Sequence, residues 1–227
     1  MKTRIIQLTA LIIVALFLMP NEMIAQGNKK KAKAPKAEKG ATVQLFNGKD
    51  LKNWTFFLKD PAVDPKTVFT VKDGVINIKG DPFGYMRTKE SYSDYKLHVE
   101  YRYPAELSNS GVFIHAQGAD TIWLKCIECQ LKAGSAGDFV CMNGSDMNER
   151  KDKSNRVVKK LTESNEKSVG EWNTMEVTCK ANTIEVVVNG VLQNKGTNLN
   201  ITSGSICLQS EGKTIEFKNV FITKLNK

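Results

Sequence analysis

The strongest constraint on the fold is a run that alternates strictly between apolar and polar side chains. The apolar or aromatic side chains of Tyr95–Tyr103 occupy every odd position. The positions between them hold Lys96, His98, Glu100 and Arg102. Successive side chains of a β-strand point to opposite faces of the sheet, so this run predicts a strand with one buried face. On this pattern His98 is a solvated surface histidine.

Similar short runs recur along the chain and are separated by turn signals. Asp73-Gly74 joins two β-rich runs and predicts a hairpin with a type I′ turn, and Asn189-Gly190 gives a similar signal. No long segment shows helical periodicity, which leaves an all-β sandwich or jelly roll. A polar stretch at residues 143–170 is expected to form a long loop. Other expected strands are Gly84–Thr88, Gly111–Gln117, Trp123–Lys132, Asp138–Met142, Trp172–Cys179, Ser205–Ser210 and Ile215–Leu225.

The amino terminus has the features of a secretory signal. Residues 1–25 begin with two basic side chains, continue with the apolar run Ile5–Met19 and end in Met23-Ile-Ala25. An uncleaved membrane anchor is the alternative, although the apolar run is short for a span. Residues 26–40 hold six lysines and predict a disordered basic tether. We therefore expect a domain at 41–227 that is periplasmic or secreted and not inserted in the membrane after cleavage.

Charge and cysteine content limit the functions that this domain can have. Most of the net charge of +9 precedes residue 41, so the sequence does not predict nucleic-acid binding. Five cysteines in an exported chain leave at least one thiol unpaired or intermolecular. Cys126 and Cys129 form a CxxC pattern, but residues three apart on a strand point to opposite faces. A redox or zinc site is therefore not expected there.

The stretch Thr121–Lys132 is predicted to be an interior strand that carries polar side chains. Alternation places on one face Trp123, Ile127, Cys129 and Leu131. It places on the other face Leu124, Cys126, Glu128 and Gln130. A carboxylate and a carboxamide among apolar neighbours cost desolvation free energy unless polar groups meet them. They either bond to neighbouring strands or face water, or they line a ligand cleft. The pattern alone leaves both open.

Few residues are suited to acid–base chemistry. Glu128 is the first candidate, followed by Glu211 and Glu100. His115 follows Phe113 by two and is expected to share its face, which suits either a sugar site or an ordinary packed surface. No nucleophile elbow or phosphate loop is present, and a calcium site made of carbonyls and carboxylates would not be visible in the sequence.

Several motifs, taken in order, resemble the 3-keto-disaccharide hydrolase domain family. The resemblance runs from about Val43 to the C-terminus through Leu45–Trp54, Val71–Ile76, Met86–Glu90, Tyr95–Arg102, Asn109–Phe113, Glu128–Leu131, Gly170–Asn173, Val188–Val191, Leu208–Gln209 and Ile215–Val220. It implies a concanavalin-like jelly-roll β-sandwich of two antiparallel sheets with a carbohydrate cleft. It also implies hydrolysis of glycosides whose sugar a partner oxidoreductase has oxidised to a 3-keto form.

The resemblance further implies roles for particular residues. Glu128 would remove the proton at C2 of the sugar, and Arg87 would bind the enolate or a hydroxyl. The remaining assignments are His115 as a third catalytic residue, and Gln130, Asn109, Gln209 and Glu211 as substrate-binding residues. A divalent cation at the leaving group is possible in this chemistry, with no ligands assigned. The alternatives are a non-catalytic carbohydrate-binding module, a glycosidase with two carboxylates, and a structural role in the envelope.

Overall fold

The computed structural model describes residues 40–226, so the predicted signal at 1–25 and the tether up to residue 39 lie outside the described residues. Within 40–226 no helix has the length and apolar character needed to cross a membrane. One 3-10 turn, η1 (Pro65–Thr67), accompanies the strands. One sheet consists of β1 (Thr42–Gln44), β3 (Phe69–Lys72), β4 (Val75–Ile78), β6 (Tyr95–Arg102), β11 (Asn173–Lys180), β12 (Thr183–Val188), β13 (Val191–Gly196) and β15 (Ile215–Lys224). The other consists of β2 (Trp54–Leu58), β5 (Gly84–Thr88), β7 (Gly111–Gln117), β8 (Lys125–Gln130), β9 (Phe139–Met142), β10 (Val157–Val158) and β14 (Ser205–Ser210).

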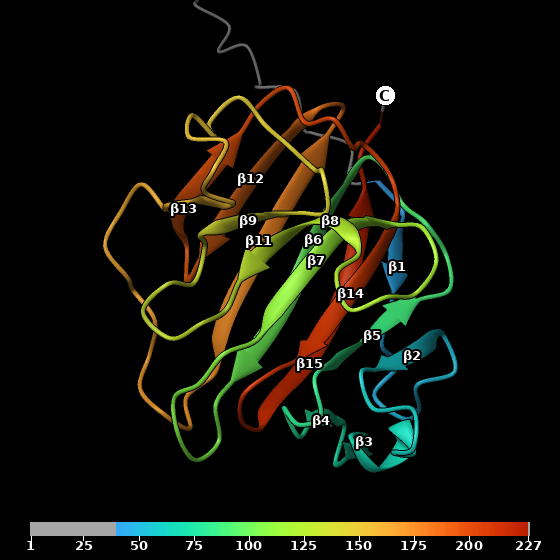
Figure 1. Cartoon of the computed structure of the whole chain (residues 1–227). Helices are drawn as coiled ribbons and strands as arrows, with labels where there is room; N and C mark the ends of the chain where they lie inside the picture. The colour runs from blue at the N-terminus through green and yellow to red at the C-terminus, as the bar shows by residue number, and fades with distance from the viewer. Residues whose placement is uncertain (1–39, 227) are drawn as a thin grey trace, which may run out of the picture. The chain divides into compact units, whose positions relative to one another are not determined.

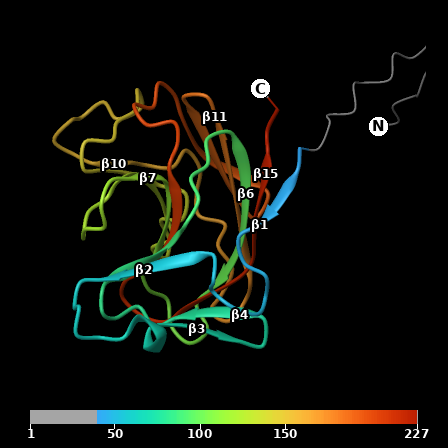
Figure 2. The same cartoon turned by 90° about the vertical axis from the view of Figure 1, so that its right-hand side faces the viewer.

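The two sheets pack face to face as a β-sandwich (Figures 1 and 2). The eight-stranded sheet has the order β13-β12-β11-β6-β15-β4-β3, with β1 also paired to β15, and the seven-stranded sheet has the order β10-β9-β8-β7-β14-β5-β2. The described strand pairs are antiparallel, and strands distant in sequence lie side by side, as β7 and β14 do. The predicted fold class, an all-β jelly roll of two antiparallel sheets, is confirmed.

The core lies between the sheets, where the alternation of β6 predicted it. Leu97 and Val99 of β6 are fully buried in one cluster with Ile114 of β7 and Ile127 of β8. The opposite face of β6 carries ion pairs, including one of 2.9 Å between Lys96 and Glu176. Burial of one face and solvation of the other explains why this strand forms from its pattern.

Two predicted turns have the backbone that their sequences require. Asp73 and Gly74 have φ values of 50° and 77°, and Asn189 and Gly190 have φ values of 47° and 81°. A type I′ turn needs a positive φ at both central residues, and Asn, Asp and Gly tolerate that conformation best. Both turns therefore connect antiparallel neighbours, β3 to β4 and β12 to β13.

All five cysteines are buried and free. Cys126 belongs to a cluster on the outside of the seven-stranded sheet, whereas Cys129 lies in the core between the sheets. The two halves of the CxxC pattern thus point to opposite faces, as strand geometry predicts. Burial raises the pKa of Cys141 to about 11 and that of Cys179 to about 12, which disfavours the reactive thiolate.

Candidate active site

The candidate site lies on the face of the seven-stranded sheet that is turned away from the eight-stranded sheet, which we call the outer face. Glu128 of β8 projects from this face, while its neighbours Ile127 and Cys129 enter the core. Glu128 retains only 5% of its exposure. Glu128 is opposite Phe113 of β7, and Phe113 is opposite Cys207 of β14. The predicted alternation of β8 is confirmed here.

A glycine on the neighbouring strand makes room for the Glu128 side chain. Gly111 of β7 is opposite Gln130, two residues along β8 from Glu128. A Cβ atom at Gly111 would overlap Oε1 of Glu128 and would lie 2.8 Å from its Cγ and Cδ. The Glu128 side chain therefore leans across β7 over the backbone of Gly111. Any larger residue at position 111 would displace it.

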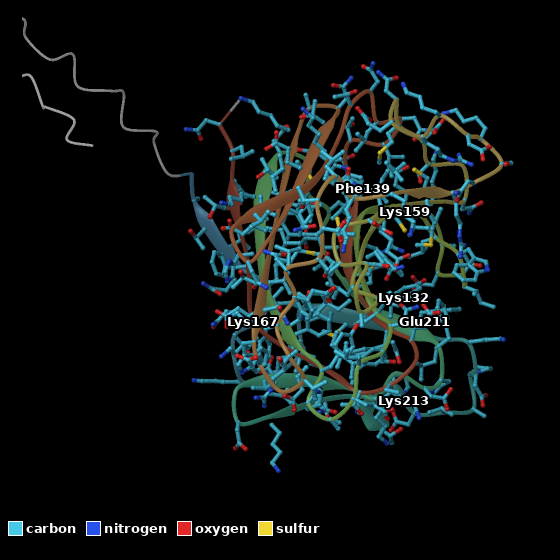
Figure 3. All side chains as sticks on the ribbon, turned by 90° about the vertical axis from the view of Figure 1, so that its left-hand side faces the viewer. Lys132, Phe139, Lys159, Lys167, Glu211 and Lys213 are labelled. Atoms are coloured by element: carbon cyan, nitrogen blue, oxygen red, sulfur yellow. The ribbon has the colours of Figure 1, made fainter. Side chains whose placement is uncertain are left out.

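On the far side of Gly111 from Glu128, β14 and the segment after it carry polar side chains. Leu208 of β14 pairs with Val112, so the next residue, Gln209, is level with Gly111. Nε2 of Gln209 donates a hydrogen bond of 2.8 Å to Oε2 of Glu211, which is labelled in Figure 3. The backbone of Asn109 packs against Gly212, next to Glu211. Gln209 and Glu211 thus lie across β7 from Glu128, and Asn109 lies beside the turn that follows Glu211.

Three oxygen atoms of this cluster are buried without a hydrogen-bond partner from the protein. They are Oδ1 of Asn109, Oε1 of Glu128 and Oε1 of Gln209. A buried polar atom without a partner costs about 1–3 kcal/mol, so such atoms rarely gather by chance. Oε1 of Glu128 and Oε1 of Gln209 belong to residues on the same outer face, and such acceptors are suited to receive hydroxyl groups or a proton from a ligand.

The electrostatic environment of Glu128 favours its neutral form. Burial and, to a smaller extent, the negative charge of Glu211 raise the pKa of this carboxyl from 4.5 to about 8, whereas Arg156 opposes the shift. Loss of hydration disfavours the carboxylate, and a second carboxylate nearby repels it. A carboxyl that titrates near neutral pH can both take up and return a proton.

This pKa shift makes the stability of the domain depend on pH. Between about pH 4.5 and pH 8 the folded state binds more protons at Glu128 than the unfolded state, so the free energy of unfolding falls as the pH rises. Glutamine does not ionise, so Glu128→Gln removes this fall in the free energy of unfolding. The variant is expected to be more stable than the wild type by a few kcal/mol at pH 9 and by much less at pH 5, since one pKa unit is worth about 1.4 kcal/mol. Urea unfolding at both pH values checks this. A difference between the proteins that stays constant with pH would contradict it.

Arg87 lies on the outer face, and its guanidinium forms hydrogen bonds with the segment between β7 and β8. It donates to the carbonyl oxygen of Gly118 at 3.0 Å, to Oδ1 of Asp120 at 3.1 Å and to the carbonyl oxygen of Ala116 at 3.3 Å. The hydroxyl of Tyr85 lies 3.1 Å from the same Asp120 oxygen. These contacts hold the segment between β7 and β8 against β5, and the role of Arg87 as a clamp on substrate stays a prediction.

His115 does not share the face of Phe113, contrary to the sequence prediction. A β-bulge lies between Ile114 and Gln117, and His115 has a φ of 51°. The extra residue of a bulge reverses the alternation beyond it. The ring of His115 is fully buried, with its nitrogens 3.2 Å from the carbonyl oxygens of Ile201 and Ser93. The structure therefore separates His115 from the cluster around Glu128.

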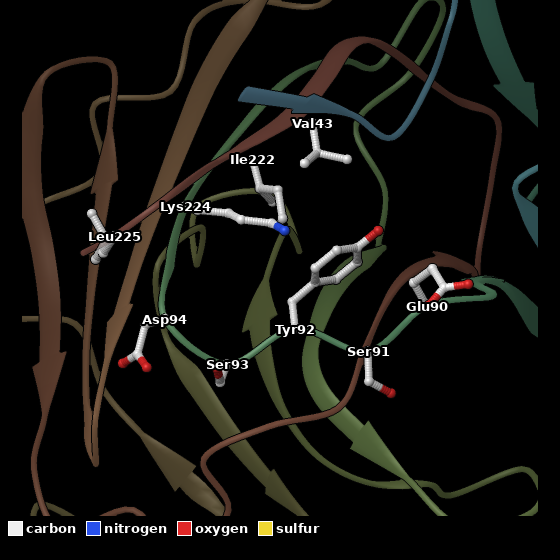
Figure 4. A pocket seen from close by; sticks show the side chains of 9 residues that line it. All are labelled: Val43, Glu90, Ser91, Tyr92, Ser93, Asp94, Ile222, Lys224 and Leu225. Carbon is white, nitrogen blue, oxygen red and sulfur yellow. The ribbon is translucent and has the colours of Figure 1, made fainter. Parts of the chain in front are cut away.

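Ser93, beside His115, also lines a cavity of about 450 Å³ at the end of β15 (Figure 4). Tyr92 and Lys224 line the same cavity. None of the predicted site residues is among its lining residues. Within residues 40–226, no group of three or more His, Cys, Asp or Glu side chains forms a cluster suited to a metal ion.

The remaining predicted residue, Gln130, lies at the end of β8. Its carboxamide oxygen accepts hydrogen bonds of 2.9 Å from the backbone nitrogens of Leu131 and Lys132. This oxygen is therefore occupied by the backbone just past the end of β8, and the amide NH₂ group is the part suited to bind a sugar hydroxyl.

Two residues of the site were missed by the sequence analysis. Arg156 precedes β10 and is the cation that acts on the Glu128 carboxyl. Trp123 was expected on a strand, on the same face as Ile127 and Cys129, but β8 begins only at Lys125, and the Trp123 side chain is 45% exposed. The guanidinium carbon of Arg156 lies 5.2 Å from the centre of the Trp123 ring. No local pattern marks Arg156, because it lies in the irregular segment at 143–170.

The buried carboxyl and the carboxamides thus lie on one sheet face of a jelly-roll sandwich. The chain belongs to the family described as the 3-keto-alpha-glucoside-1,2-lyase-like domain, which matches residues 41–223. The predicted family is thereby confirmed, and membership supports a carbohydrate-cleaving hydrolase.

Solved structures share the fold at low sequence identity. A candidate glycosyl hydrolase from Parabacteroides distasonis is 22% identical, with a TM-score of 0.59, covering 82% of this chain and 94% of that one. A Bacillus licheniformis β-glucanase is 12% identical, with a TM-score of 0.55, covering 83% and 99%. A carbohydrate-binding module from Bacillus subtilis is 10% identical, with a TM-score of 0.54, covering 74% and 93%. No curated protein sequence matches the chain.

Proposed function

We propose that the domain cleaves glycosides whose sugar carries a ketone at C3. The ketone acidifies the hydrogen at C2, so a carboxylate can remove it as a proton. The observation that supports this proposal most directly is the buried carboxyl of Glu128, with a pKa raised to about 8 and Oε1 without a partner. A base of this kind is suited to proton transfer near neutral pH.

The proposed reaction has two steps. Glu128 takes the C2 proton, the electron pair forms the C1=C2 double bond through the enolate of the ketone, and the C1–O bond to the aglycone breaks. The proton held by Glu128 then passes to the departing oxygen, which releases the aglycone as an alcohol and restores the carboxylate. Water then adds across this double bond, with its hydroxyl at C1 and a proton at C2, and gives the free 3-keto sugar. Arg156 would stabilise the negative charge that develops on the oxygen leaving C1. Asn109, Gln209 and Glu211 would bind sugar hydroxyls.

This chemistry requires a supplier of substrate and an environment in which the two meet. A partner oxidoreductase must convert the C3 hydroxyl of the glycoside to a ketone, because the elimination needs the ketone beforehand. We propose that the domain acts on such products in the periplasm or outside the cell, in keeping with the signal predicted at residues 1–25.

A second candidate function is an ordinary glycosidase with two carboxylates. The observation that favours it is Glu211, whose charge acts on Glu128. Retaining and inverting enzymes both use a carboxyl pair across the glycosidic bond. A carbohydrate-binding module without turnover is the third candidate, because this fold also occurs in such a module.

A paired substrate assay separates the three functions. The wild-type protein is incubated with methyl 3-keto-glucoside and with the unoxidised methyl glucoside, each with and without a chelator. We expect methanol release from the keto form only. Release from the unoxidised form would instead indicate a two-carboxylate glycosidase, and binding of either form without release would indicate a binding module. Loss of turnover with chelator that added cation restores would assign a metal to the reaction.

A further inference from the structure

Trp123 is an exposed aromatic side chain that is held in place. Its ring centre lies 5.4 Å from that of Phe83, at an interplanar angle of 54°. Arg156 covers it from another direction. Leaving so large an apolar surface in water costs free energy, yet the ring does not turn into the core beside it. An exposed aromatic ring with fixed neighbours is a preformed surface for a ligand.

The segment that carries Trp123 is anchored on both sides. Arg87 binds the carbonyl oxygen of Gly118, and the backbone nitrogen of Thr121 donates to the Tyr85 hydroxyl at 3.2 Å. On the other side of Trp123, Leu124 is buried in the cluster on the outer face. The indole is therefore positioned before any ligand arrives, which lowers the entropic cost of binding.

Arg156 connects this aromatic surface to Glu128. The same guanidinium lies over the Trp123 ring and acts on the charge of Glu128. Arg156 precedes β10, whereas Gln209 belongs to β14, and the two strands flank β8 from opposite sides in the order of the sheet. Glu128 thus has the Trp123 ring and the Arg156 guanidinium toward one edge of the sheet. Toward the other edge it has the carboxamide of Gln209 and the carboxylate of Glu211.

We propose that Trp123, Phe83 and Arg156 form the binding subsite for the aglycone, and that this subsite takes an aglycone ring with a flat apolar face. The C–H face of a second sugar and an aromatic phenol both present such a face to an indole. Arg156 would stabilise the negative charge on the departing oxygen at C1, next to the carbon that Glu128 deprotonates. This inference rests on the proposed function and identifies the aglycone as the part of the substrate by which the protein would discriminate among glycosides.

The test compares three 3-keto-glucosides that differ only in the aglycone: methyl, 4-nitrophenyl and a second glucose. In Trp123→Ala, kcat/KM for the two ring aglycones is expected to fall about tenfold to hundredfold, the size of a lost stacking surface. The value for the methyl glycoside is expected to change less than about twofold, because methyl cannot cover the indole. Trp123→Phe keeps a ring and is expected to recover part of the loss.

Trp172→Ala is the matched control. Trp172 packs against Arg102 and Lys218 on the eight-stranded sheet and is expected to leave all three rates unchanged. Selective loss with either ring aglycone supports the subsite and identifies its ring. An equal loss with all three substrates, or none, would overturn the subsite while the proposed function stands. A wild-type protein that releases no aglycone from any keto-glucoside would overturn both.

Discussion

Glu128→Gln is expected to lower kcat on a 3-keto-glucoside by about 10²–10⁴, the usual contribution of a positioned general base. Glutamine has nearly the same shape but cannot accept the C2 proton. The buried position is retained, because the side chain lies over Gly111 in either protein. Steady-state release of 4-nitrophenol measures the loss, and isotopic exchange at C2 shows whether the missing step is proton removal.

The pH profile of the wild-type enzyme provides the companion measurement. Glu128 must be ionised to act as the base, and its pKa is about 8, so kcat/KM is expected to rise with pH through that region. The low-pH limb should vanish in Glu128→Gln. A variant that retains more than about a tenth of the activity, or an unshifted profile, would assign the base to another residue.

Gly111→Ala is expected to reduce kcat by about 10² although it touches no substrate, because a misplaced catalytic group costs about that factor. The added Cβ would occupy the space of the Glu128 carboxyl and push it out of position. The free energy of unfolding is expected to fall by about 1–3 kcal/mol, the usual cost of overpacking. Turnover of the keto-glucoside and urea unfolding measure the two effects separately.

Gly196→Ala is the matched control for this substitution. Gly196 of β13 is crowded by Sδ of Met147 at 2.8 Å and by Cγ2 of Ile184 at 3.0 Å from the position of an added Cβ. It belongs to the eight-stranded sheet, away from Glu128. A similar loss of stability without a loss of kcat is expected there. Equal losses of kcat in the two variants would mean that Gly111 has only a packing role.

The fold follows from the sequence wherever a period of two is uninterrupted. The alternation of Tyr95–Arg102 separates a buried face from a partly exposed one, and that of Lys125–Gln130 separates the core from a buried outer face. The turn at Asp73-Gly74 needs only local backbone preferences. The pattern alone therefore places Glu128 on the face opposite Ile127 and Cys129, but it does not show what that face contacts. The assignment of Gln209 to the same site required the resemblance to a family, because no local rule relates β8 to β14.

Other features depend on contacts that a sequence pattern does not contain. The bulge at His115 adds one residue to β7 and moves the ring to the opposite face. Trp123 looks like a strand residue, but the contacts of Tyr85 and Arg87 hold its segment apart from the ladder. Arg156 has no periodic neighbours, and the need for glycine at position 111 appears only when the strand register is known.

The anchored segment between β7 and β8 has a consequence for how enzymes of this kind diversify. Glu128, Gly111 and Gln209 stand on hydrogen-bonded strands, where a change in one residue disturbs its neighbours. Trp123 and Arg156 stand on connecting segments, which tolerate substitution and insertion more readily. Under the proposed function, natural variation can therefore change the leaving group that is accepted while Glu128 and its strand neighbours are retained, so related proteins can cleave different glycosides.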